Sequence, residues 1–108
     1  PECLKGTGYN EKSDMWAMGC VLYELCMLEH PFSGQSLMGL MYNICEGEVN
    51  IKLPACYSAE MADLIARLFN RDPTARPTTA ALLVCPLVAA HIKEVATKVA
   101  AIESDKVA

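Results

Sequence analysis

One stretch, SDMWAMGCVLYELCMLEHPF at residues 13 to 32, constrains the fold of this chain more than any other. An aspartate, Asp14, stands near its head, and the next fourteen residues are apolar on every face of a helix, interrupted only by Glu24. A helix that is hydrophobic all round is stable in water only when other elements cover it. We therefore expect a buried helix at the centre of the fold.

The central helix is predicted to begin at Ser13, a good N-cap, and to end at about Glu29, because Pro31 forbids its continuation. Further helices are expected at about 36–47, 58–70 and 79–84, the last of them interrupted at Cys85-Pro86. Ser58 is predicted to cap the 58–70 helix, whose inner face is predicted to be formed by Met61, Leu64, Ile65 and Leu68. The stretch 48–57 has no helical period and contains a proline, so it is predicted to be an extended loop. Nothing alternates as a strand would, and the predicted fold class is all-α.

The composition is typical of one domain that buries apolar surface against additional protein structure. The chain has 108 residues, and its 53% hydrophobic content is slightly high for a soluble domain. The formal net charge is -4, from 9 basic and 13 acidic residues that are scattered along the chain, so nucleic acid and acidic membrane surfaces are poor candidates as partners. The longest other apolar run, Ala80 to Ala90, has eleven residues, whereas a membrane span needs about 20. We expect a soluble chain with no nucleic-acid or membrane partner.

The cysteines and the first residue bear on compartment and processing. The six cysteines are an even number, which would suit a disulfide framework, but no two are spaced as C-x-x-C and four lie in apolar, helix-like segments. Reduced, buried thiols in an intracellular protein are the favoured interpretation, and the clustering expected of a zinc site is missing. The sequence shows no signal peptide and opens with Pro1, which suggests a fragment or a processed piece.

The C-terminal part, residues 88–108, has an apolar pattern of its own. Five apolar residues step by 4, 3, 4 and 3 positions, the a and d spacing of a coiled coil. We call them the tail seam: Val88, Ile92, Val95, Val99 and Ile102. The pattern predicts either a short coiled coil that associates with a second copy or a terminal helix laid against its own domain, since two heptads do not decide between them.

The central stretch resembles the central helix in the lower lobe of eukaryotic protein kinases. The residues that carry this resemblance are Asp14, Trp16, Gly19, Tyr23-Glu24 and Pro31-Phe32. Three further segments match kinase motifs in the same order. They are Pro1-Glu2, similar to the end of the Ala-Pro-Glu motif, Arg71 to Thr78, similar to the arginine motif, and Leu82 to Leu87, where the family often has Leu-Leu, two residues and Pro-Phe. The amino-acid sequence of the central stretch is most similar to that of the NIMA-related serine/threonine kinases. The resemblance covers residues 1 to 87, an incomplete kinase domain, although Cys3 and Leu87 depart from the usual residues.

The resemblance implies structural roles for residues of the central helix. Asp14, with Trp16 beside it, is expected to support the catalytic loop through hydrogen bonds to its backbone, because a buried carboxylate needs such partners. Val21 and Leu25 match the anchors of the hydrophobic column beneath the adenine of the nucleotide. Taken alone, Asp14 could equally be a simple helix-capping acid. Glu24 matches a position that receives a basic substrate residue in some kinases, although pairing with an internal arginine or with water would also satisfy it.

The resemblance also implies a buried ion pair between Glu2 and Arg76. In kinases this pair ties the activation segment to the base of the lobe, and a planar guanidinium suits a carboxylate better than lysine does. Taken alone, Arg76 could be an ordinary surface charge. No residue of the chain is expected to be catalytic or to bind a metal.

The motifs that perform phosphoryl transfer do not occur in the sequence. There is no Gly-x-Gly-x-x-Gly, no His-Arg-Asp and no Asp-Phe-Gly, so the chain alone is expected to bind no cofactor, and Mg-ATP is expected only for a complete parent domain. One hypothesis is that the chain is a portion of an active NIMA-related-like kinase, which phosphorylates serine or threonine in proteins. The expected location is the cytoplasm, and the family resemblance suggests an association with the cytoskeleton. The other is a non-catalytic pseudokinase remnant that binds proteins through the 36–47 helix, a docking surface in kinases, or through the tail seam. A self-sufficient four-helix domain is disfavoured, because the central helix would have too few partners. Whether this protein is an enzyme stays open at the level of sequence.

Overall fold

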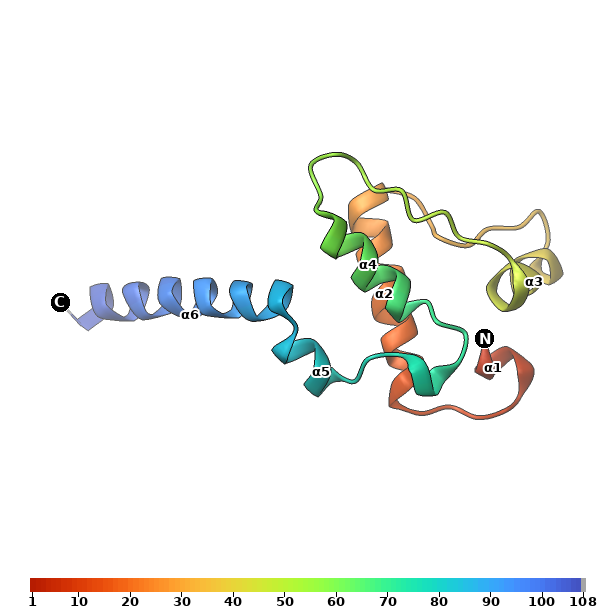
Figure 1. Cartoon of the computed structure of the whole chain (residues 1–108), viewed down its shortest axis with the longest axis horizontal. Coiled ribbons are helices and arrows are strands. Elements are labelled where there is room, and N and C mark those ends of the chain that lie inside the picture. The colour runs from red at the N-terminus through yellow and green to blue at the C-terminus, as the bar shows by residue number, and fades with distance from the viewer. Residues whose placement is uncertain (108) are drawn as a thin grey trace. The chain divides into compact units, whose positions relative to one another are not determined.

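The computed structural model describes residues 1–107, so Ala108, the last residue of the predicted tail, lies outside the described part. The elements in chain order are α1 (Glu2–Lys5), α2 (Glu11–Met27), α3 (Leu37–Glu46), α4 (Ala59–Leu68), the 3₁₀ turn η1 (Pro73–Ala75), α5 (Thr79–Val84) and α6 (Pro86–Val107) (Figure 1). Residues 1–107 contain no strand, and the predicted all-α class is confirmed. The chain forms two compact units, Pro1–Thr78 and a second unit that begins at Thr79.

The predicted start of the central helix is wrong by three residues. α2 is capped by Asn10, whose side chain accepts a hydrogen bond from the Lys12 backbone N–H at 2.9 Å. Ser13 lies inside the first turn, and its hydroxyl donates to the carboxylate of Glu2 at 2.7 Å instead of capping. The helix ends at Met27 because Leu28 adopts the left-handed conformation, with φ of 58°.

Within this chain α2 buries one stripe although it is apolar on all faces. The buried residues of the stripe are Met15, Trp16, Gly19, Tyr23 and Cys26. The other faces keep Met18, Val21, Leu25 and Leu28 exposed. This is the outcome expected if the helix has too few partners within the chain to cover every face.

Gly19 sets how closely α4 approaches α2. A Cβ at this position would lie 2.9 Å from the Cβ of Leu68 and 3.0 Å from Cε1 of Phe69, so a larger residue would push the two segments apart. The inner face predicted for α4 is confirmed: Leu64, Ile65 and Leu68 are buried, and Met61 is partly buried against the core. Ser58 caps this helix as predicted, accepting from the Met61 N–H at 3.3 Å.

The core of the first unit lies where α2, α4 and the extended loop meet. Tyr23, Cys26 and Ile65 form its centre, and the loop 48–57 contributes Val49, Ile51 and Leu53 at its edge. An aromatic cluster continues the core toward the head of α2. Its ring centroids are 5.3 Å apart for Trp16 and Phe32, 5.2 Å for Trp16 and Phe69, and 5.4 Å for Phe32 and Phe69. The segment Pro31-Phe32 after α2 is thus held against the core by the aromatic ring of Phe32.

The second unit is a short helix followed by a long one. α6 has 22 residues and is therefore about 33 Å long. Pro86 occupies its first position, where a missing N–H costs nothing, and the N–H of Ala89 donates to the carbonyl of Cys85 at 2.9 Å. The interruption predicted at Cys85-Pro86 is confirmed.

The same region is apolar enough to meet a length-and-composition test for a membrane span. Among the described residues one such stretch exists, Pro73–Lys106, and 6% of its most apolar window is buried. The stretch is not one uninterrupted helix, because it contains η1, α5, the break at Cys85 and α6. The expectation that the chain has no membrane partner stays a prediction.

Candidate functional site

The most elaborate polar contact in the first unit joins Arg76 to Glu2. Nη1 of Arg76 donates to one carboxylate oxygen at 2.7 Å, and Nη2 donates to the other at 2.8 Å. Arg76 is 2% exposed and Glu2 is 9% exposed. The structure therefore brings the two predicted residues together as a buried, bidentate ion pair, the strong form of an arginine–carboxylate contact.

Two further N–H groups of Arg76 are also used, which helps to explain how a guanidinium is tolerated inside the fold. Nε donates to the carbonyl of Asn70 at 2.6 Å, and Nη1 also donates to the carbonyl of Lys12 at 2.8 Å. The guanidinium carbon lies 5.0 Å from the centre of the Trp16 ring. Arg76 thus connects the start of α1, the first turn of α2 and the turn after α4.

The charge of Glu2 is fixed by these partners. The Arg76 guanidinium, which donates to the carboxylate, lowers the pKa of Glu2 well below its usual range. Burial opposes this by raising the pKa, and the hydroxyl of Ser13 adds to the lowering. The carboxylate is therefore ionised throughout the neutral range, and the pair is held together as two charges.

Two contributors to this site were missed from the sequence, Lys12 and Ser13. Nζ of Lys12 donates to the carbonyl of Arg76 at 2.6 Å and lies 3.5 Å from the carbonyl of Pro73. Ser13 donates to Glu2, as described above. Ser13 precedes Asp14 directly and Lys12 lies two positions before it, but their partners are 64 positions away for Lys12 and 11 for Ser13, so no local pattern identifies them.

A second arginine, Arg71, binds the C-terminal end of α3, a contact that the sequence did not predict although Arg71 begins the segment similar to the arginine motif. Its Nε donates to the carbonyl of Ile44 at 3.2 Å, and Nη2 donates to the carbonyls of Asn43, at 3.3 Å, and Gly47. These carbonyls lie at the C-terminal end of α3, where a helix leaves carbonyls without intrahelical donors, although that of Asn43 also accepts from the Gly47 N–H at 3.0 Å. α3 has no basic residue of its own in the last turn, and that gap is the one local signal for such a partner.

The other predicted residues of the central helix lie on open faces. Asp14 is exposed and accepts a hydrogen bond from the hydroxyl of Tyr9, which raises the pKa of that tyrosine. Val21 is 54% exposed and Leu25 is 65% exposed. Glu24 contacts the ring nitrogen of His30, and within residues 1–107 it pairs with no arginine. Only Trp16 of this group is buried, within the aromatic cluster.

The sequence of this chain matches the family model of the protein kinase domain over residues 1–88. The chain belongs to the protein kinase family. The match includes α1, the whole of the Arg76–Glu2 site and the start of α6, so these features are parts of a kinase domain.

Relatives of this chain include protein kinases named Nek3, Nek11 and fin1. Serine/threonine-protein kinase Nek3 of Mus musculus is 43% identical over 83 residues, which are 77% of this chain and 16% of the relative. Serine/threonine-protein kinase Nek11 of Mus musculus is 42% identical over 86 residues, 80% of this chain and 14% of the relative. G2-specific protein kinase fin1 of Schizosaccharomyces pombe is 41% identical over 88 residues, 82% of this chain and 12% of the relative. This chain is thus NIMA-related-like, and it spans about one seventh of the length of these relatives.

Residues 1–107 contain no group of three or more histidine, cysteine, aspartate or glutamate side chains placed to hold a metal ion. Magnesium bound with a nucleotide is coordinated by protein carboxylates together with oxygens of the phosphates. We therefore assign no step of phosphoryl transfer to the residues of this chain.

Proposed function

We propose that this chain forms the structural floor of the lower lobe in a serine/threonine kinase of the NIMA-related type. Such an enzyme moves the γ-phosphate of Mg-ATP to a protein hydroxyl, and the reacting groups come from parts of the enzyme outside these 108 residues. The observation that carries the proposal is the buried bidentate pair of Arg76 and Glu2 within a matched kinase domain. Its role is to fix the end of the activation segment on the lobe.

The open faces of α2 support the same proposal. Val21 and Leu25 are large apolar residues that remain exposed in this chain, and a helix of this composition needs cover on those faces. We assign them the role of anchors for the hydrophobic column beneath the adenine. Asp14, whose one hydrogen bond within the described residues is to Tyr9, is assigned to the backbone of the catalytic loop, with Trp16 holding the helix in place.

Glu24 is proposed to receive a basic residue of the protein substrate. Its side chain is 41% exposed, and its present partner, His30, is 82% exposed, so a cationic peptide can replace the histidine at little cost. The expected substrates are proteins with a basic residue near the acceptor hydroxyl.

A second candidate function is a non-catalytic module that binds other proteins. The observation that favours it is α3, which has no buried residue and exposes Leu37, Met38 and Tyr42. A pseudokinase would use this helix as a docking surface without any transfer of phosphate. In either case we place the protein inside the cell, in the cytoplasm and with a cytoskeletal association suggested by the family resemblance.

The native size of the protein separates the two functions. An antibody raised against residues 91–108 is used to immunoblot cells that express the protein, and the band is cut out for N-terminal and tryptic sequencing. A band several times heavier than 11.8 kDa, with His-Arg-Asp and Asp-Phe-Gly among its peptides, supports the kinase. A band near 12 kDa, or a heavier one whose peptides lack both motifs, contradicts the kinase and supports the docking module.

A further inference from the structure

The end of α2 turns in a way that brings His30 to Glu24. Glu24 lies in the last turn of the helix, and its backbone carbonyl accepts from the N–H of Leu28 at 2.8 Å. Leu28 then adopts the left-handed conformation, with φ of 58°, a conformation that usually requires glycine. After this turn the ring of His30, six positions beyond Glu24, contacts the Glu24 carboxylate.

The residues that follow His30 fix the turn from the other side. Pro31 restricts the backbone of His30 to extended conformations. The ring of Phe32 stacks on Trp16, with ring centroids 5.3 Å apart. All these residues belong to the first unit, so the contact of His30 with Glu24 does not depend on where the second unit lies.

The cation that Glu24 meets is one that can lose its charge. Within residues 1–107 Glu24 forms an ion pair with His30, and with no lysine or arginine. Histidine is the side chain whose charge ordinarily changes between about pH 5 and 8. Two other titratable groups lie near the pair. Cys20, one turn earlier on α2, has its pKa raised by burial and by the charge of Glu24, so its thiol stays protonated near neutral pH. Glu29, beside His30 in the chain, adds a second carboxylate that favours the protonated imidazole.

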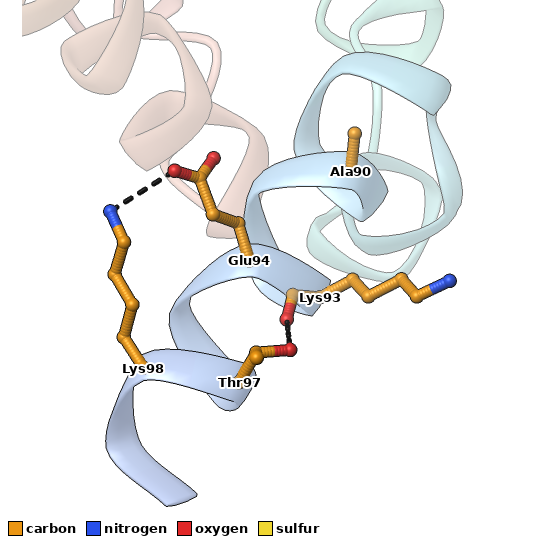
Figure 2. Close-up of a pocket in the computed structure, with 5 residues that line it drawn as sticks. All are labelled: Ala90, Lys93, Glu94, Thr97 and Lys98. Atoms are coloured by element: carbon orange, nitrogen blue, oxygen red, sulfur yellow. Dashed lines mark hydrogen bonds and ion pairs between the residues drawn. The ribbon is translucent and has the colours of Figure 1, made fainter. Parts of the chain in front are cut away.

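A second histidine–glutamate pair in the chain shows a different arrangement. Nδ1 of His91 lies 3.7 Å from a carboxylate oxygen of Glu94 in α6. Glu94 also pairs with Lys98 at 3.0 Å (Figure 2). A lysine keeps its charge throughout the neutral range, so Glu94 has a permanent cation whereas Glu24 has a titratable one. The α6 pair lies outside the matched residues 1–88 and provides a control.

We propose that His30 sets how strongly this protein prefers a basic residue in its substrate, by competing with that residue for Glu24. The competition rests on the proposed function of Glu24 and names the residue that regulates it. Protonated His30 holds the carboxylate that the substrate's cation needs, and neutral His30 leaves it available. Arginine in the substrate stays charged throughout. The preference therefore rises as the pH rises through the range in which histidine loses its proton.

The test measures this preference on the whole protein. Its full-length coding sequence is expressed in cells and the purified protein is offered serine peptides with one arginine at successive positions around the serine. Matched peptides carry citrulline, which is neutral and has nearly the same shape as arginine. The quantity measured is the ratio of kcat/KM for the arginine peptide to that for the citrulline peptide. Because both peptides meet the same enzyme, the pH dependence of the chemical step cancels in the ratio.

Three states of residue 30 are compared from about pH 6 to about pH 8. In the wild type the ratio should rise about two- to fivefold over this range, the effect expected of one exposed ion pair. His30→Gln, which is never charged, should give a high and constant ratio. His30→Lys, which is always charged, should give a low and constant one. The change should lie in KM with kcat unaltered, because Glu24 binds substrate and transition state equally. His91→Gln, the matched control, should follow the wild type.

The outcomes separate this competition from the proposed role of Glu24. Equal ratios for the wild type, His30→Gln and His30→Lys, with a lower ratio for Glu24→Gln, would overturn the competition and leave that role intact. A ratio that Glu24→Gln does not change would overturn both. A merely structural role of His30 would alter the activity toward both peptides alike and leave their ratio constant with pH, which also counts against competition.

Binding of the same peptides extends the test to a protein that transfers no phosphate. The peptides are labelled with a fluorophore, and their dissociation constants are measured by fluorescence polarisation over the same pH range. The same order of variants in the binding ratio, without phosphate transfer, would support the competition and contradict the kinase. Binding that is equal for arginine and citrulline peptides, or that no substitution of His30 alters, would overturn the competition.

Discussion

Arg76 donates two hydrogen bonds to the carboxylate of Glu2 across a sequence separation of 74 residues, and both residues are buried. The pair closes the first unit by joining the start of α1 to the turn after η1. Both charges are removed from water, so the pair stabilises the fold only while the two residues are together. Either charge buried without the other would destabilise it.

Removal of either Arg76 or Glu2 should therefore lower the free energy of unfolding. Arg76→Ala leaves the Glu2 carboxylate buried without its cation, and about 3–5 kcal/mol of unfolding free energy should be lost. Arg76→Lys keeps a positive charge but cannot donate in two parallel directions, so it should recover only part of that loss. The measurement is the thermal aggregation midpoint of the tagged protein in cell lysate. Arg67→Ala is the control, because Arg67 is exposed and forms a surface ion pair with Asp63 at 3.4 Å, and a change of about 0.5 kcal/mol or less is expected. Equal effects of Arg67→Ala and Arg76→Ala would contradict this account of the pair.

The pair should also make stability depend on pH in the acid range. The pKa of Glu2 is lowered in the folded chain, chiefly by Arg76, so the folded state holds fewer protons than the unfolded one between the two pKa values. The stabilisation is fully present above the ordinary glutamate pKa of about 4.3 and is lost as pH falls below it toward the folded value. Resistance to proteolysis is compared for the wild type and Glu2→Gln from neutral pH down to about pH 3. The difference in resistance between the wild type and Glu2→Gln should be largest at neutral pH and should shrink as the pH falls. A difference that grows in acid would contradict a lowered pKa of Glu2 in the folded chain.

Arg71 should control the local stability of α3. Arg71→Ala leaves the carbonyls of Asn43, Ile44 and Gly47 without their cationic donor, and hydrogen bonds to a charged group contribute about 1.5–3 kcal/mol each at most. Hydrogen exchange of the α3 amides should therefore become faster while the amides of α4 change little. Uniformly faster exchange in α2, α3 and α4 would mean that Arg71 supports the whole unit and not the end of one helix.

The exposed face of α2 should govern the behaviour of the chain when it is produced alone. We expect the wild-type chain to aggregate or to bind a hydrophobic dye, since Met18, Val21, Leu25 and Leu28 are open to solvent. The double variant Val21→Glu with Leu25→Lys should bind less dye at unchanged helicity, because it alters only that face. A sharp cooperative melt of a clean wild-type monomer would show that the face needs no cover.

Features that depend on neighbouring residues, such as a helix cap or an amphipathic helix face, could be predicted from the sequence. Features that depend on contacts between distant residues could not. The cap at Ser58 and the inner face of α4 follow from one residue type and one spacing, and both are confirmed. Asn10 and Ser13 are both good N-caps, and the choice between them is made by the distant carboxylate of Glu2, which takes the Ser13 hydroxyl.

The buried stripe of α2 could not be predicted for a different reason. Its residues are apolar in every direction, so no period distinguishes Tyr23, which is buried, from Leu25, which is exposed. The position of Gly19 against Leu68 and Phe69 selects the face that α4 covers. The Arg76–Glu2 pairing came from the kinase resemblance alone, because no local rule links residues 74 positions apart.

The central claim is that this chain supports the active site of a kinase, and transfer of phosphate by the native protein tests it most directly. The protein is captured from cells with an antibody to residues 91–108 and incubated with radiolabelled Mg-ATP and casein, beside the same protein carrying Arg76→Ala or Arg67→Ala. We predict label on serine and threonine of the casein with the wild type and with Arg67→Ala, and a large loss with Arg76→Ala. No transfer by a well-folded, full-size native protein, or equal transfer by all three, would contradict the claim.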